Sequence, residues 1–105
     1  MAFLEKAVLA ALMTNATHYV DLGGNAAVIY YENETTAHMR LPDGTRYSGK
    51  WTLAADGYHV AWHNGPEGDW RLSYAPGRIG YVDAIGKDHG PVTRIVHGDP
   101  ESLAK

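Results

Sequence analysis

The sequence predicts a mainly β protein, an antiparallel meander of about eight short strands that forms a small barrel or strongly curled sheet, with one N-terminal α-helix. Turn-forming Gly, Asn, Asp and Pro recur at short intervals after residue 14, and the segments between them are rich in β-branched and aromatic residues. Residues 2–13 follow a helical period instead. A chain of 105 residues is long enough for one domain, 1–105.

The predicted helix over 2–13 is amphipathic. Apolar side chains recur on one stripe at helical spacing, namely Leu4, Val8, Ala11 and Leu12. A helix of about three turns must bury such a stripe against the rest of the fold. The apolar stretch lacks the basic flank and the length of a secretory signal, and no segment reaches the roughly 18 apolar residues of a membrane span. We therefore expect a cytoplasmic protein with no membrane partner.

Eight strands are expected after the helix, and the turns between them are short. The strands lie near residues 17–22, 26–32, 35–41, 45–54, 57–63, 68–75, 78–85 and 91–97. Connections this short join neighbouring strands as antiparallel hairpins, which makes a meander the simplest topology. The barrel or curled sheet would span 17–98, and residues 99–105 would form a tail.

The alternation of side chains assigns faces to these strands. In 45–54, Tyr47, Trp51 and Leu53 alternate with polar residues, so one face is dry and one is wet. The same parity turns inward a set of rings that consists of Tyr47, Tyr58, Tyr74, Tyr81, Trp51, Trp62 and Trp70. The chain has seven Tyr and three Trp against one Phe, and each buried phenol or indole needs a hydrogen-bond partner.

Two interpretations of these inward rings stay open. In the first, the hydroxyl groups bond to one another, to the backbone or to water in a packed core. In the second, the rings line a pocket for a small apolar or aromatic ligand, with a few convergent hydrogen-bonding groups. The candidate ligand-binding walls are Tyr47, Tyr58, Trp62, Trp70, Tyr74 and Tyr81.

A Gly-x-Trp element occurs twice, as Gly49-Lys50-Trp51 and as Gly68-Asp69-Trp70. Together with the eight antiparallel strands in sequence order and the single helix, it resembles the calycin superfamily, the lipocalin-like barrels, over residues 17–98. In lipocalins the element belongs to the first strand, whereas here it falls in the fourth and sixth predicted strands. The resemblance implies a small apolar ligand in the barrel mouth, and a minority of such barrels are enzymes.

A proton-transfer site is the alternative that the sequence offers. Asp83 shares the inward parity of Tyr81, and burial of its carboxyl group would raise its pKa. His97, on the last predicted strand, is the expected catalytic partner, and His18 could also face inward. Such a pair would serve a cofactor-free isomerase, cyclase or lyase. The competing interpretation is that Asp83 caps the end of its strand beside Gly86.

Several classes of function are disfavoured by composition and spacing. The chain has no cysteine, which excludes disulfides, thiolate metal sites and a cysteine nucleophile. His59 and His63 lie four residues apart on a predicted strand, a separation of about 13 Å that prevents joint binding of one metal ion. No cofactor motif is present, and a net charge of −3 makes nucleic acid an unexpected partner.

A third possibility is a homo-oligomeric interaction protein with a filled core. The last predicted strand would then lie at the edge of an incompletely closed sheet. An exposed strand edge invites pairing with another chain. Residues 92–97 would accordingly join two copies into a homodimer.

Overall fold

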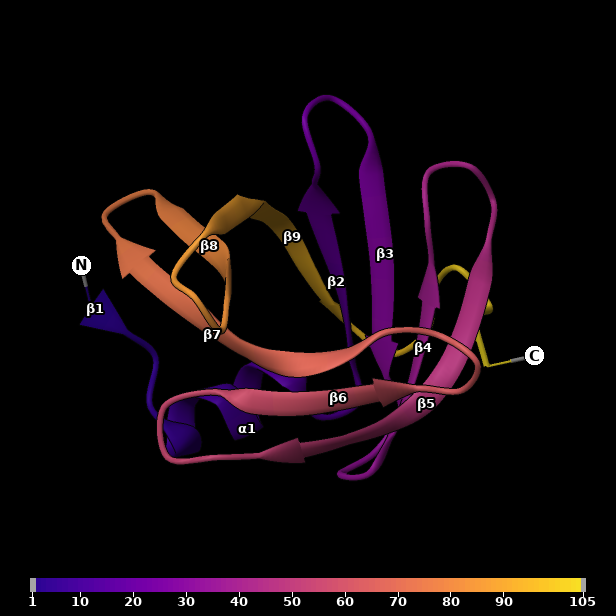
Figure 1. Cartoon of the computed structure of the whole chain (residues 1–105), viewed down its shortest axis with the longest axis horizontal. Helices are drawn as coiled ribbons and strands as arrows, with labels where there is room; N and C mark the ends of the chain where they lie inside the picture. The colour runs from indigo at the N-terminus through magenta and orange to yellow at the C-terminus, as the bar shows by residue number, and fades with distance from the viewer. Residues whose placement is uncertain (1, 105) are drawn as a thin grey trace.

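The strands close into an eight-stranded antiparallel barrel in the computed structural model, which describes residues 2–104 (Figure 1). Each strand from β2 to β9 pairs with the next, and β9 pairs back with β2. The elements are β1 (Ala2–Phe3), α1 (Lys6–Met13), β2 (Ala16–Asp21), β3 (Ala26–Tyr31), β4 (Thr36–Arg40), β5 (Arg46–Leu53), β6 (Tyr58–Trp62), β7 (Glu67–Ala75), β8 (Arg78–Asp83) and β9 (Asp88–His97). The predicted fold class is confirmed.

The first residues of the chain form a strand, and the prediction that the helix starts at residue 2 is wrong. Ala2 and Phe3 pair with Tyr74 and Ser73 of β7, while α1 begins at Lys6. This pairing is available because β6 covers the same edge of β7 only as far as Trp70, which leaves the last residues of β7 open to a partner.

Helix α1 closes one end of the barrel. The backbone N–H of Lys6 donates to the carbonyl of Ala55 in the β5–β6 turn, and the N–H of Asn15 donates to the carbonyl of Tyr31 at the end of β3. Leu9 and Met13 are the fully buried side chains of the helix. No helix among residues 2–104 is long and apolar enough to cross a membrane.

The buried face of α1 differs from the predicted stripe. Val8 is 39% exposed and Ala11 is also exposed, whereas Leu4 and Leu12 are half-buried. Because the helix begins four residues later than predicted and its approach is set by β1, the face that meets the core is rotated toward Leu9. The spacing of apolar residues alone does not predict which face of the helix is buried, since nearly every residue of this helix is apolar.

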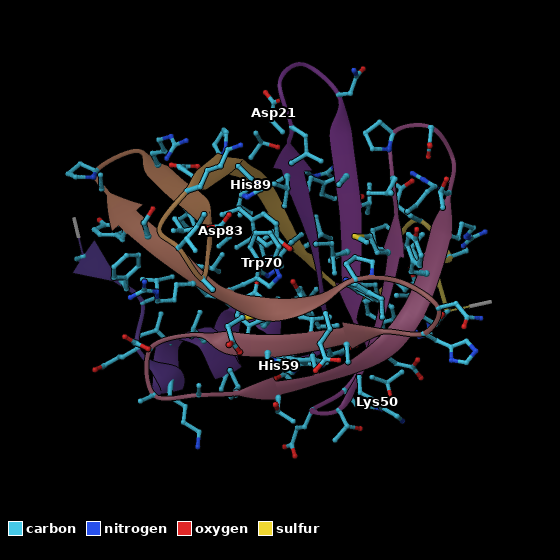
Figure 2. The ribbon with its side chains drawn as sticks, in the orientation of Figure 1. Asp21, Lys50, His59, Trp70, Asp83 and His89 are labelled. Atoms are coloured by element: carbon cyan, nitrogen blue, oxygen red, sulfur yellow. The ribbon has the colours of Figure 1, made fainter. Side chains whose placement is uncertain are left out.

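The predicted alternation of the strands is confirmed for β5 and β6. Trp51 is buried, and Lys50 and His59 project from the outer surface of these strands (Figure 2). The interior is one cluster of buried side chains from α1 and every strand of the barrel, namely Leu9, Met13, Val20, Ile29, Tyr31, Ala37, Met39, Trp51, Tyr58, Val60, Trp62, Leu72, Tyr81 and Val92.

The barrel is closed, which contradicts the expectation of an incompletely closed sheet. β9 pairs with β2 from Val92 to His97 along one side, whereas its pairing with β8 on the other side runs only from Asp88 to Val92. Beyond Val92 the strand is paired on the β2 side only, because the ladder with β8 ends there. The homodimer through 92–97 stays a prediction.

The predicted tail is an ordered segment that packs on the outside of the barrel. The Thr17 hydroxyl donates to the carbonyl of Gly98, and the Tyr19 hydroxyl donates to Glu101. Leu103 packs against Val28 and Tyr30 in a small second cluster. Residues 98–104 therefore form a strap over β2 and β3, while residue 105 lies outside the described range.

Candidate functional site

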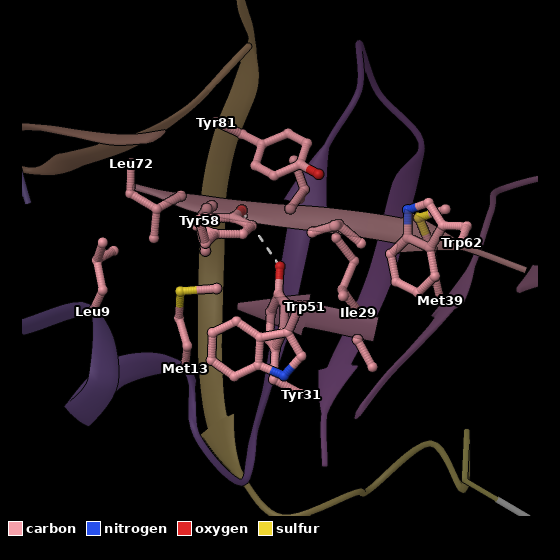
Figure 3. Close-up of a cluster of buried hydrophobic side chains, with 14 residues drawn as sticks. Leu9, Met13, Ile29, Tyr31, Met39, Trp51, Tyr58, Trp62, Leu72 and Tyr81 are labelled. Carbon is pink, nitrogen blue, oxygen red and sulfur yellow. Dashed lines mark hydrogen bonds between the residues drawn. The ribbon is translucent and has the colours of Figure 1, made fainter. Parts of the chain in front are cut away.

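The interior of the barrel is filled by aromatic rings in edge-to-face contact (Figure 3). Tyr31 meets Trp51 at a centroid distance of 5.0 Å and Tyr58 at 5.9 Å, and its hydroxyl lies 3.4 Å from that of Tyr58. The Trp51 Nε1–H donates to the carbonyl of Asn33 at 2.8 Å. Burial raises the pKa of Tyr31, Tyr58 and Tyr81, so these phenols stay neutral and serve as hydrogen-bonding core residues.

A small cavity remains at the barrel mouth. Its volume is about 60 Å³, and its walls include Val60, Trp62, Pro66 and Trp70. A cavity of this size holds a few water molecules, whereas sites for drug-sized ligands run to about 300–1,000 Å³. A ligand of several carbon atoms therefore needs a site outside the packed interior.

The six predicted wall residues are not equivalent in the structure. Tyr58, Trp62 and Tyr81 are buried members of the core cluster, and Tyr47 and Trp70 are partly buried against it. Tyr74 is 51% exposed, contrary to its predicted inward position. β7 continues beyond β6 at this point, and Tyr74 there lies opposite Ala2 of β1, outside the enclosed interior.

A cluster of four side chains lies where β7, β8 and β9 meet. Trp70 stacks on Tyr81 with ring centroids 4.1 Å apart and planes 9° from parallel. The His89 ring meets the Trp70 ring edge-on at 5.1 Å, and its Nε2 lies 2.8 Å from Asp83 Oδ2. Figure 2 shows Asp83, His89 and Trp70 close together near the β8–β9 turn. The strands β7, β8 and β9 thus bring an indole, a carboxylate and an imidazole, respectively, to one place.

Asp83 has a different environment from the one predicted. The hydrogen bond with His89 lowers the pKa of Asp83, and the backbone N–H groups of Lys87 and Ile85 lower it further by donating to Oδ1. The expectation of a raised pKa is wrong because hydrogen bonds to the carboxylate outweigh its burial. His97 is exposed at the far end of β9 and is not the partner of Asp83. The capping interpretation of Asp83 is confirmed by the two backbone contacts.

His89 was missed because the sequence placed residues 86–91 in a turn. A register shift between Gly80 and Val82 sets Val82 opposite Asp88. This shift continues β9 back to Asp88 and brings His89 beside Asp83. The sequence signal that could have identified His89 is its position across a tight hairpin from Asp83.

An open groove lies against this cluster, and we call it the rim groove. Its volume is about 330 Å³, and it is lined by Glu67, Gly68, Asp69, Trp70, Asp83, Ala84, Ile85 and His89. Ile85 is 89% exposed, although its backbone N–H is anchored by Asp83. A second groove of about 380 Å³ shares Asp69, Trp70 and Ala84 with the rim groove and extends toward Asp56 and Arg71.

His59 contacts two of the carboxylates that line the rim groove. His59 Nδ1 lies 2.8 Å from Asp69 Oδ1, and its Nε2 lies 2.8 Å from Glu67 Oε2. These hydrogen bonds raise the pKa of His59, with Asp69 as the larger cause. Within residues 2–104, no three potential metal-ligating His, Cys, Asp or Glu side chains form a metal-binding group.

His18 faces the interior, as the sequence allowed, but it lies beside the helix and apart from Asp83. Its Nε2 is 2.8 Å from the carbonyl oxygen of Leu12, and its ring meets Tyr31 edge-on at 5.2 Å. Burial lowers the pKa of His18 to about 4, partly opposed by the hydrogen bond to Leu12. The neutral imidazole is therefore a structural link between β2 and α1.

A scan of protein-family models, a search of curated proteins and a search of solved structures each found no match to this chain. The fold and the site define the class: a small closed antiparallel β-barrel with a filled interior and an open groove at its rim.

Proposed function

We propose that this protein binds a small aromatic or apolar molecule in the rim groove, as a lipocalin-like barrel of the calycin type. The observation that carries the proposal is a pair of large apolar side chains held at an open groove. Trp70 is fixed by its stack on Tyr81, and Ile85 stands 89% exposed in a turn anchored by Asp83. Contact with a ligand would remove this apolar surface from water.

The exposed Ile85 side chain gives this site a source of binding free energy. Full burial of an Ile side chain contributes about 1.5–3 kcal/mol, and this residue gains almost none of that within the chain. A ligand of six to ten carbon atoms that covers Ile85 and the edge of Trp70 would supply the missing contact. The proposed site lies at the rim, where the open groove has a volume of about 330 Å³, whereas the cavity beside Val60 and Trp62 has only about 60 Å³.

An NMR titration with 2-phenylethanol tests this proposal. We expect saturable shifts in the Trp70 indole N–H signal and in the backbone signals of Ile85 and His89. Ile85→Ser should weaken binding severalfold without unfolding the protein, because the side chain contributes little to the core. Val8→Ser, which changes a partly exposed residue on α1, is the matched control and should leave binding unchanged. Shifts confined to α1, or none at all, would refute the proposal.

A second candidate function is cofactor-free proton transfer, favoured by the contact between Asp83 and His89. The 2.8 Å hydrogen bond orients the imidazole through Nε2 and leaves Nδ1 to exchange a proton with a bound carbon acid. In this role His89 is the base and Asp83 positions it. Isomerisation, cyclisation and elimination all begin with such a step.

Hydrogen–deuterium exchange at carbon distinguishes the two candidates. With 1-phenyl-2-propanone in D₂O, an enzyme would accelerate exchange of the benzylic protons, and His89→Gln would abolish the acceleration while retaining binding. If the ketone binds and exchanges at its rate in free solution, the groove is a binding site only.

A further inference from the structure

We infer that the rim groove selects an organic cation, an amine carried on an aromatic or apolar body, over neutral or anionic compounds of the same shape. The inference rests on the proposed ligand-binding function and adds the chemical class of the ligand. It follows from the charges that surround the apolar surface of the groove.

The groove combines an apolar floor with acidic walls. Its apolar part is formed by the Trp70 indole, Ala84 and Ile85, while carboxylates stand along two sides of it. Glu67 and Asp69 come from β7, and Asp83 ends β8. No lysine or arginine is among the described residues that line the groove. A ligand bound at Trp70 is therefore surrounded by negative charge.

The local histidines do not cancel this charge. His59 is shared by Glu67 and Asp69, and His89 is paired with Asp83. Even with both imidazoles protonated, the carboxylates outnumber them. The side chains of Glu67 and Asp69 are 65% and 73% exposed, so both can turn toward a ligand without being pulled from a packed site.

The nearest arginine on β7 is engaged elsewhere. The Arg71 guanidinium lies over the Phe3 ring at 4.2 Å and approaches Asp56 at 4.0 Å. These contacts direct it to the neighbouring groove and to β1. The positive charge of Arg71 is consequently not available to receive an anionic ligand at the Ile85 side of Trp70.

The indole of Trp70 adds a second preference for a cation. A positive charge within about 6 Å of an indole face is attracted by the ring quadrupole, and Trp provides the strongest such contact among the aromatic residues. The stack on Tyr81 and the edge contact from His89 hold the Trp70 ring in one orientation. An ammonium group over the face of this ring that Tyr81 does not cover would contact Asp69 or Glu67 while the apolar body of the ligand covers Ile85.

Three probes that carry the same phenyl group on a short chain test the inference on the intact chain: 2-phenylethylamine, 2-phenylethanol and phenylacetate. Their dissociation constants would be measured at pH 7 in low salt from the Trp70 indole signal, assigned with Trp70→Phe. Exposed ion pairs and cation–π contacts are each modest, so we expect the amine to bind roughly three- to tenfold tighter than the alcohol, and the acid to bind most weakly. In 0.5 M salt the preference should shrink.

Two charge variants locate the effect. Asp69→Asn and Glu67→Gln should reduce the ratio between alcohol and amine dissociation constants toward one. Glu34→Gln removes one negative charge from the exposed β3–β4 turn and is the matched control, expected to keep the ratio. Circular dichroism would establish that all variants are folded.

The outcomes separate the preference for a cation from ligand binding itself. Equal binding of all three probes, or tightest binding of the acid, would overturn the cation class while the proposed ligand-binding function stands. A preference that survives in both Asp69→Asn and Glu67→Gln would also overturn it, because the charge of the groove would then not be its origin. If no probe shifts the Trp70 signal, the proposed function itself fails.

Discussion

Acid should weaken this protein through the single buried imidazole of His18. In the unfolded chain this group takes up a proton near pH 6.5, whereas in the folded protein burial lowers the pKa to about 4. Between these values the unfolded state binds more protons, so the free energy of unfolding falls as the pH falls. The separation of the two pKa values predicts a loss of about 3 kcal/mol between pH 7.5 and pH 4.

The assay is urea unfolding at several pH values for the native chain and for His18→Gln. The glutamine amide can still donate to the carbonyl of Leu12, but it cannot be protonated in this range. Subtracting the two unfolding free energies at each pH removes the contributions of other groups. One of them is His59, whose raised pKa stabilises the folded protein as the pH falls. Another is Asp83, whose lowered pKa makes the folded protein less stable only when the pH approaches the ordinary pKa of an aspartate.

The expected result is a difference between the two proteins that declines by about 3 kcal/mol as the pH falls to 4, and an NMR titration of the His18 ring with a midpoint near 4. A loss of this size is a large share of the 5–15 kcal/mol typical of a domain. A ring that titrates at 6 to 7, or parallel pH profiles of the two proteins, would refute the reasoning, since both require a solvated imidazole.

Three substitutions test the packing, and a fourth, Gly77→Ala, is the control for the first of them. Gly90→Ala should destabilise by about 2 kcal/mol or more in urea unfolding, because a Cβ there would lie 1.7 Å from the carbonyl oxygen of Asp21. At Gly77 the φ angle is also positive, but a Cβ would meet open space. If Gly77→Ala destabilised the protein as much as Gly90→Ala, the clash with Asp21 would not be the cause of the loss. Leu103→Ala should cost about 2–3 kcal/mol, whereas a loss within error would mean that the C-terminal strap detaches freely. Trp51→Phe should cost about 1–3 kcal/mol in thermal unfolding, since it removes ring volume and a buried donor, and an unchanged Tm would contradict that assignment.

The strand pattern was predictable where each side chain has one environment. In β5, Tyr47 and Trp51 face the core while Lys50 faces water, and a period of two records this difference directly. The start of the chain was not predictable, because the pairing of Ala2 and Phe3 with β7 depends on an edge that β6 leaves open. Local sequence contains no information about which part of a distant strand is already paired.

The site was predictable in composition but not in pairing. Trp70, Tyr81 and Asp83 were all singled out from parity, and the structure places the two rings in a stack beside the carboxylate. The expected partner of Asp83 was wrong because register shifts change which residues of two strands are opposed. One such shift beside Val82 brings His89 into place, and the hydrophobic alternation of β9 does not reveal it.

The division between a filled interior and an open rim explains how stability and binding can be separated in so small a barrel. The rings that join α1 to the core, such as Trp51 and Tyr58, are completely buried and have partners for their polar atoms. Ile85 lies outside this core, on a turn that Asp83 holds through backbone contacts. Changes in the Ile85 side chain therefore leave the core intact, whereas a change in Trp51 removes packing that no ligand at the rim can replace. The binding proposed for this rim would therefore vary without cost to the fold, which is the behaviour expected of loops on a rigid scaffold.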